Sequence, residues 1–238
     1  MTPLLEARGL TKHFAVGRGF LGQTGGVVRA VDDVAFSIEP GRTLGVVGES
    51  GCGKTTTAKL VLRLEKPTAG QILFANQDVA GLEGEALRAY RKSVQAVFQD
   101  PFASLNPRMR VDAIISEPLI THNLGIVARM CDQVAVMYAG RLVEAGPVRS
   151  IFNEPAHPYT RALIESIPKF GDVTERLTAI EGQPPDPAAL PPGCAFHPRC
   201  PYVIDRCRAE APPESQLGPQ HRARCWVAAP ATVGAARG

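Results

Sequence analysis

The sequence is poor in features that would assign it to membrane or secreted proteins. It has no apolar run long enough to span a membrane, and the start Met1-Thr2-Pro3 lacks the basic and apolar regions of a signal peptide. Disulfide frameworks belong to oxidising compartments and small secreted domains, so the six cysteines of this 238-residue chain do not predict one. We therefore expect a soluble, cytoplasmic protein.

The chain also has little net charge and few aromatic residues. The formal charge is +3, aromatic residues make up 6% of the chain, and the basic residues are dispersed. A nucleic-acid surface needs clustered basic side chains, so we expect no nucleic-acid partner. The hydrophobic content of 45% is enough for one good core with an appendage.

A glycine-rich segment between a strand and a helix organises the first half of the chain. Gly48-Glu49-Ser50-Gly51-Cys52-Gly53-Lys54-Thr55-Thr56 contains the pattern Gly-x-x-x-x-Gly-Lys-Thr. A β-branched run at 43–47 precedes it, and helical spacing at 57–64 follows it. A plain glycine-rich turn between strand and helix is the alternative, but it does not require the lysine and the threonine.

This segment has the residue types that bind a phosphate chain. Glycines let successive N–H groups point inward, and the helix that follows adds its positive end. Lys54 is expected to reach the β- and γ-phosphates, and the Thr55 hydroxyl is expected to bind Mg²⁺. Residues 48–56 therefore predict a nucleotide site.

The remaining pattern predicts an α/β fold followed by a less regular end. Strands are expected at 4–10, 27–38, 70–74, 94–99, 133–138 and 141–143, and helices at 84–92, 111–120, 147–152 and 158–167. From Gln183 onward the chain is rich in proline and cysteine and has little periodicity. This end is expected to need something other than a hydrophobic core to hold it.

Several separate segments resemble one family. Residues 30–38 precede the glycine-rich loop, Val97-Phe98-Gln99-Asp100-Pro101 resembles a Q-loop, Thr121-His122-Asn123-Leu124 resembles a switch-histidine segment, and His157-Pro158-Tyr159-Thr160-Arg161 resembles a C-terminal signature. Together they resemble the ATP-binding subunits of ABC transporters in the oligopeptide/dipeptide importer group, in the form of the second of two ATPase subunits. The resemblance implies a P-loop NTPase domain at 1–146 and an oligopeptide/dipeptide transporter C-terminal region at 147–238.

The resemblance also implies roles for three further residues. Phe14 aligns with the aromatic residue that stacks on adenine; the alternative is a strand residue that faces the core. Gln99 aligns with the residue that touches Mg²⁺ and the attacking water, and otherwise is a surface amide. His122 aligns with the histidine that contacts the γ-phosphate, and otherwise is structural. Gln99 and His122 are thus the candidate catalytic residues.

Two elements of the family pattern are absent between Gln99 and His122. One is the Leu-Ser-Gly-Gly-Gln signature, and the other is the apolar Walker B strand that ends in Asp-Glu. Ile114-Ile115-Ser116-Glu117-Pro118 has serine in place of the aspartate, so Glu117 is not assigned as the catalytic base. The missing block lies near 119–121 and is explained by a deletion, a fused partial gene or a degenerate paralogue.

The predicted function is therefore ATP binding in a peptide importer, and the sequence leaves hydrolysis open. The resemblance implies permease subunits and a second ATPase subunit as partners, an extracytoplasmic peptide-binding protein as an indirect one, and a place on the inner face of the membrane. A non-hydrolysing nucleotide-binding or interaction protein is the alternative. An unrelated P-loop kinase is a third hypothesis, against which the Q-loop and His-Pro-Tyr segments argue.

Four cysteines cluster in the proline-rich end. Cys194, Cys200, Cys207 and Cys225 are spaced Cys-x5-Cys-x6-Cys-x17-Cys. A [4Fe–4S] cluster accepts such spacing, zinc sites usually pair cysteines more closely, and free or paired thiols are the third alternative. The segment also resembles the cysteine-bearing C-terminal region of peptide-importer ATPases, some of which hold such a cluster. Cys52 and Cys131 stay outside this set.

Overall fold

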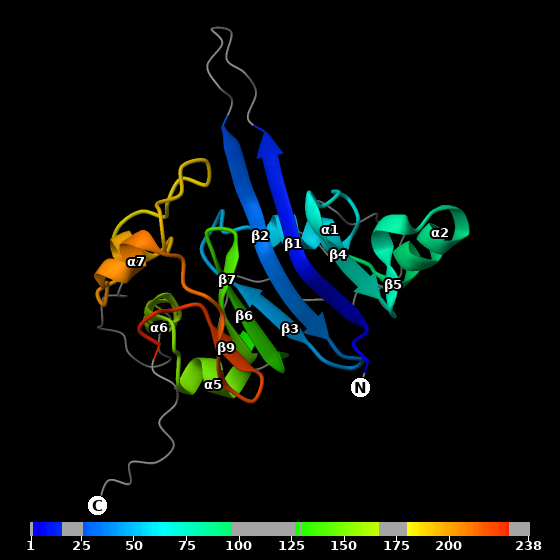
Figure 1. Cartoon of the computed structure of the whole chain (residues 1–238). Coiled ribbons are helices and arrows are strands. Elements are labelled where there is room, and N and C mark those ends of the chain that lie inside the picture. Colours follow the sequence, from blue (N-terminus) through cyan, green and yellow to red (C-terminus); the bar gives the residue numbers. More distant parts are fainter. Residues whose placement is uncertain (1, 16–25, 97–126, 129, 167–179, 229–238) are drawn as a thin grey trace, which may run out of the picture.

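The computed structural model describes residues 2–15, 26–96, 127–128, 130–166 and 180–228 (Figure 1). These residues form two sheets with helices between and beside them. One sheet has the strand order β2-β1-β4-β5, and the other has the order β3-β6-β7-β9-β8. The α/β class expected from the sequence is confirmed.

The first sheet is antiparallel and is dominated by a long hairpin. Strands β1 (Leu5–Ala15) and β2 (Val27–Ile38) form the hairpin, and β4 (Ala69–Phe74) and β5 (Gln77–Asp78) extend it on the β1 side. The predicted strand at 27–38 is confirmed with the same bounds. Of the connection between the two long strands, only residue 26 lies within the described residues.

The second sheet combines residues from both halves of the chain. Strand β3 (Leu44–Val47) pairs in parallel with β6 (Gln133–Tyr138), and β7 (Arg141–Pro147) continues antiparallel to β6. Strands β9 (His221–Ala223) and β8 (Ser215–Gly218) then add to β7. The C-terminal segment is therefore part of the same sheet as the strand that precedes the glycine-rich loop.

The helices lie at the ends and faces of these sheets. They are α1 (Lys54–Val61), α2 (Gly84–Ser93), α5 (Val148–Asn153), α6 (Pro158–Glu165) and α7 (Asp205–Ala209), with short 3-10 helices η1 (Val79–Gly81) and η3 (His197–Arg199). In Figure 1, α2 lies on one side of the β1–β2 hairpin, and α5, α6 and α7 lie on the other. No helix in the described ranges is long and apolar enough to cross a membrane.

Strand β6 is buried on both faces, which explains its continuous apolar sequence. Its side chains alternate between two clusters, as strand geometry requires. Ala135 and Met137 belong to a core cluster with residues of β1, β2 and α1. Val134, Val136 and Tyr138 belong to a second cluster with residues of α5, α6 and the C-terminal segment. The strand therefore connects the two halves of the interior.

The C-terminal segment shares this second cluster. Phe196 is buried against Tyr138 and Tyr159, with ring centroids 5.2 and 5.4 Å apart. The sequence expectation underestimated this packing because one buried aromatic residue leaves no periodic signal. The domain boundary after residue 146 stays a prediction, and β7 crosses it.

The strand expected at 94–99 is described only in part. Residues 94–96 lie in no strand, because α2 continues to Ser93 and the N–H of Val94 donates to the carbonyl of Tyr90 at 2.9 Å. The helix expected at 111–120 lies outside the described residues. The predicted helix at 84–92 is confirmed by α2.

The histidine before α6 makes stability depend on pH. His157 is fully buried, its Nδ1 accepts from the N–H of Tyr159 at 3.0 Å, and burial lowers its pKa to about 3. The unfolded chain binds a proton near pH 6.5 and the folded chain does not, so stability falls as pH drops below that value. We expect the free energy of unfolding to lose about 1.4 kcal/mol per pH unit on this account.

Urea unfolding across this pH range checks the expectation. His157→Asn is the comparison variant, because asparagine can still accept the helix-capping hydrogen bond and does not titrate. Its slope of stability against pH should be shallower by one proton. Equal slopes for the two proteins would contradict the assignment.

Candidate nucleotide-binding site

The glycine-rich loop, residues 48–56, turns between β3 and α1. Gly48 and Gly53 have φ of 154° and 109°, which favour glycine. A Cβ on Gly48 would lie 2.2 Å from the carbonyl oxygen of Met137, and one on Gly53 would lie 2.2 Å from that of Ala30. Both glycines are therefore needed for the loop to pack against β6 and β2.

The ammonium group of Lys54 lies inside the curve of the loop. It donates to the carbonyl oxygens of Gly48 at 2.9 Å and Glu49 at 2.8 Å, and Lys54 is only 6% exposed. The thiol of Cys52 lies 3.5 Å away, and burial raises the pKa of this thiol, which keeps it neutral. The loop therefore concentrates one positive charge where a phosphate chain would bind.

Helix α1 adds to this potential. Gly53 is its N-cap and makes no side-chain capping bond, so the first-turn N–H groups face outward from the helix end. Thr55, in this first turn, is exposed, as a hydroxyl that binds Mg²⁺ has to be. Ser50 and Gly51 at the tip of the loop are exposed as well.

Phe14 lies on the surface rather than in the core. It is 37% exposed, and the ammonium of Lys12 lies 4.8 Å from the centre of its ring. Phe14 pairs with Val28 on β2, two residues from Ala30, whose carbonyl limits Gly53. The exposure of Phe14 argues against the core-facing alternative, and its role toward adenine stays a prediction.

Helix α6 and the C-terminal segment also contact the loop, through two residues whose contacts sequence reasoning missed. The guanidinium of Arg199 binds the carboxylate of Glu49, and the hydroxyl of Tyr159 accepts from the N–H of Glu49 at 2.8 Å. The two ends of the ion pair are 150 residues apart. No local motif signals such a pair.

The two candidate catalytic residues cannot be placed. Gln99 and His122 lie outside the described residues, so their roles stay predictions. Among the described residues, the candidate nucleotide site consists of residues 48–56, Arg199 and Tyr159 contact Glu49 in it, and Phe14 stays a predicted member.

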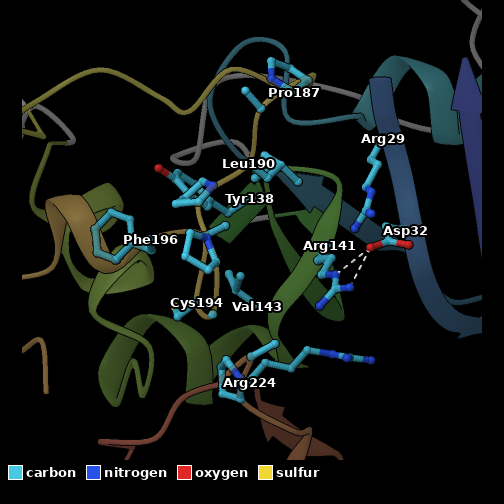
Figure 2. A pocket seen from close by; sticks show the side chains of 18 of the residues that line it. Arg29, Asp32, Tyr138, Arg141, Val143, Pro187, Leu190, Cys194, Phe196 and Arg224 are labelled. Atoms are coloured by element: carbon cyan, nitrogen blue, oxygen red, sulfur yellow. Dashed lines mark hydrogen bonds and ion pairs between the residues drawn. The ribbon is translucent and has the colours of Figure 1, made fainter. Parts of the chain in front are cut away.

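A cavity of about 560 Å³ is lined by none of the loop residues 48–56 (Figure 2). Arg29, Arg141 and Arg224 line it, and Arg141 is paired with Asp32 through contacts of 2.6 and 2.9 Å. The cavity is bounded by the C-terminal segment, and of the predicted site residues that the structure describes only Cys194 lines it. A smaller hollow of about 180 Å³ lies directly against residues 49–52.

The four clustered cysteines interact but do not form a ready metal site. All four are free thiols, and burial raises the pKa of Cys194 to about 11, with Cys200, Cys207 and Cys225 adding to the rise. Within the ranges that the structure describes, no group of three or more His, Cys, Asp or Glu side chains could hold a metal ion. The donor set suits a metal centre, whereas its described arrangement does not.

Comparisons with known proteins show which family the chain resembles. The family model described as "ABC transporter" matches residues 31–154, and the model described as "Oligopeptide/dipeptide transporter, C-terminal region" matches residues 143–207. The chain is 35% identical to the probable peptide ABC transporter ATP-binding protein y4tS of Sinorhizobium fredii, over 97% of this chain and 91% of that protein. It is 33% identical to the di/tripeptide transport ATP-binding protein DppF of Pseudomonas aeruginosa, over 94% of this chain and 98% of that protein.

A solved structure bears on the fold, and the length of the Sinorhizobium alignment bears on the missing block. A nucleotide-free ATP-binding cassette from an ABC transporter matches with a TM-score of 0.50 and 16% identity, covering 68% of this chain and 98% of that one. The alignment with the Sinorhizobium protein runs over 322 positions, although this chain has only 238 residues. That relative therefore contains residues for which this chain has no counterpart.

Proposed function

Because the chain belongs to the ABC transporter ATP-binding proteins and carries the oligopeptide/dipeptide transporter C-terminal region, we propose that it is the ATP-binding subunit of a peptide importer. ATP and Mg²⁺ bind at residues 48–56. The observation that carries the proposal is the complete phosphate loop, with the Lys54 ammonium held inside it at 2.8 and 2.9 Å from two loop carbonyls.

The partners follow from the function of such a subunit. The protein works at the inner face of the cell membrane, against permease subunits that form the channel, and beside a second ATPase subunit. An extracytoplasmic binding protein delivers the peptide, so this chain does not choose the substrate. The matches to peptide transport proteins over more than nine tenths of the chain support this assignment.

A non-hydrolysing protein is the second candidate, and the alignment length favours it. The sequence lacks the Asp-Glu pair and the signature between Gln99 and His122, and a relative contains positions that this chain does not fill. A chain of this kind binds ATP through the phosphate loop without positioning the attacking water.

Adenine stacking on Phe14 gives a direct test of the nucleotide site. Phe14→Ala is expected to weaken ATP binding about tenfold, since one stacking contact contributes roughly 1–3 kcal/mol. Titration with a fluorescent ATP analogue measures this, with Phe14→Trp as the variant that keeps the aromatic face. Unchanged affinity in Phe14→Ala, with normal binding by the wild type, would remove Phe14 from the site.

For the cysteine segment we propose a [4Fe–4S] cluster held by Cys194, Cys200, Cys207 and Cys225. The four thiols supply the ligands that such a cluster takes, and the other three cysteines all contribute to the raised pKa of Cys194. Because the described arrangement brings no three ligands to one ion, loading requires the segment to rearrange. The cluster is given no part in ATP chemistry.

Metal analysis of anaerobically purified protein tests this proposal. We expect brown protein with about four iron atoms per chain, and loss of colour and iron in Cys200→Ser. Cys131→Ser is the control, because Cys131 is a buried cysteine outside the set. Colourless protein with stoichiometric zinc would assign the site to zinc, and metal-free protein would leave four thiols.

A further inference from the structure

A partly buried ion pair, with the side chain of Glu49 25% exposed, joins the C-terminal segment to the phosphate loop. The two terminal nitrogens of Arg199 contact the two carboxylate oxygens of Glu49 at 2.7 and 3.0 Å. The side chain of Arg199 is only 4% exposed. Bidentate pairs of this kind fix direction as well as distance, and they are strongest when water is excluded.

Arg199 also makes hydrogen bonds to residues outside the phosphate loop. It donates to the carbonyl oxygens of Glu181 at 2.9 Å and Ile180 at 3.2 Å, and to the hydroxyl of Tyr138 at 3.3 Å. Its hydrogen bond with Glu49 is the main cause of a raised pKa, so Arg199 stays charged. The position of the Arg199 side chain is therefore set by Ile180, Glu181 and Tyr138 as well as by its contact with Glu49.

Tyr159 holds the same loop residue through the backbone. Its hydroxyl accepts from the N–H of Glu49 at 2.8 Å, and its ring is fully buried, 4.6 Å from that of Tyr138. Glu49 is thus fixed by its side chain and by its amide, both from residues of the C-terminal half. Its carbonyl in turn accepts from Lys54 at 2.8 Å.

The charge of Glu49 explains why this clamp matters for a phosphate ligand. A carboxylate in the loop repels phosphate oxygens, and the repulsion grows where water is excluded. The guanidinium of Arg199 neutralises that carboxylate and draws it toward the C-terminal segment. In the part of the loop that the structure describes, Lys54 is then the charged side chain that no ion pair neutralises.

We propose that Arg199 and Tyr159 are positioning residues for ATP. Through them, the C-terminal segment and helix α6 hold the phosphate loop in the shape that binds ATP. The inference rests on the proposed ATP binding and adds to it a second part of the chain. The nucleotide site is in this sense composite, since its phosphate loop is completed by residues 159 and 199.

A charge-removal series tests the proposal. In Arg199→Gln, the carboxylate of Glu49 is left unpaired, so affinity for a fluorescent ATP analogue should fall at least about tenfold. Adding Glu49→Gln removes the repulsive charge and should restore affinity to within a few-fold of wild type. A merely structural role of Arg199 predicts no such rescue. Arg8→Gln is the matched control, because Arg8 makes a bidentate pair with Glu6 on the exposed surface.

Tyr159→Phe provides a test that preserves the aromatic packing. It removes only the hydroxyl that accepts from Glu49, so hydrogen exchange of a peptide covering residues 45–56 should speed up several-fold without nucleotide. This readout needs no ATP binding, so it separates the inference from the proposed function, which wild-type titration tests. Unchanged exchange in Tyr159→Phe, or a double variant no better than Arg199→Gln alone, would overturn the inference. If Arg199→Gln does not fold, the exchange experiment decides.

Discussion

Replacing Lys54 with alanine is expected to lower the affinity for ATP by at least about 100-fold, because charged hydrogen bonds to two phosphates are lost together. The ammonium is already enclosed by the loop, where it donates to the carbonyl oxygens of Gly48 and Glu49. Its charge is therefore positioned before the nucleotide arrives. Without it, the loop offers only N–H groups and the helix end to a highly charged ligand.

Equilibrium titration with a fluorescent ATP analogue measures the loss. Lys59→Ala is the matched control, since Lys59 lies on the same helix but is exposed and in its last turn. Thermal unfolding without nucleotide is followed in parallel, because Lys54→Ala also removes two hydrogen bonds that hold the loop. Equal affinity of wild type and Lys54→Ala, with both proteins folded, would show that residues 48–56 are not the phosphate site.

The phosphate loop could be predicted because its chemistry is local. Glycines, lysine and threonine follow one another between a strand and a helix, and the structure has Lys54 inside the loop and Thr55 exposed in the first turn of α1. The roles of these residues and of Phe14 toward a nucleotide stay predictions, and the structure shows only that the ring of Phe14 is exposed. The strand pattern of β1 fixes where its last residues lie.

The contacts behind the loop could not be predicted, because they depend on tertiary packing. Glu49 and Arg199 are 150 residues apart, and each is an ordinary surface residue type in its own segment. The same holds for β9, which is only three residues long and is a strand because it pairs with β7, a strand distant in the sequence. Short strands and buried arginines become recognisable only when the partner surface is known.

Among the described residues, the second sheet ends at β3 on one side and at β8 on the other, and β3 pairs there with β6. The family resemblance places a further apolar strand, ending in Asp-Glu, between Gln99 and His122. The carboxylates that would hold Mg²⁺ through water and polarise the attacking water are therefore absent, while the phosphate loop is complete.

ATP hydrolysis by this chain alone is accordingly expected to stay near background, at least about three orders of magnitude below a relative that contains the block. Phosphoryl transfer depends on positioning the metal and the water together, and losing a single preorganised group commonly costs 10²–10³ in rate by rough estimate. We therefore expect this protein to bind ATP while hydrolysing it only near the background rate. ATP affinity depends on Lys54, whereas turnover is limited by groups that the sequence does not contain.

Phosphate release measured on the wild type, Lys54→Ala and Gln99→Ala decides the matter. We expect all three to show the same residual rate, because with no catalytic carboxylate neither a weaker phosphate loop nor a lost Gln99 amide has much turnover left to reduce. The Pseudomonas relative, whose alignment with this chain runs over 318 positions, is purified and assayed in the same way for comparison. A robust wild-type rate that Lys54→Ala abolishes would mean that another carboxylate of this chain takes the catalytic position. Glu117, the residue before Pro118, would then be the first to replace with glutamine.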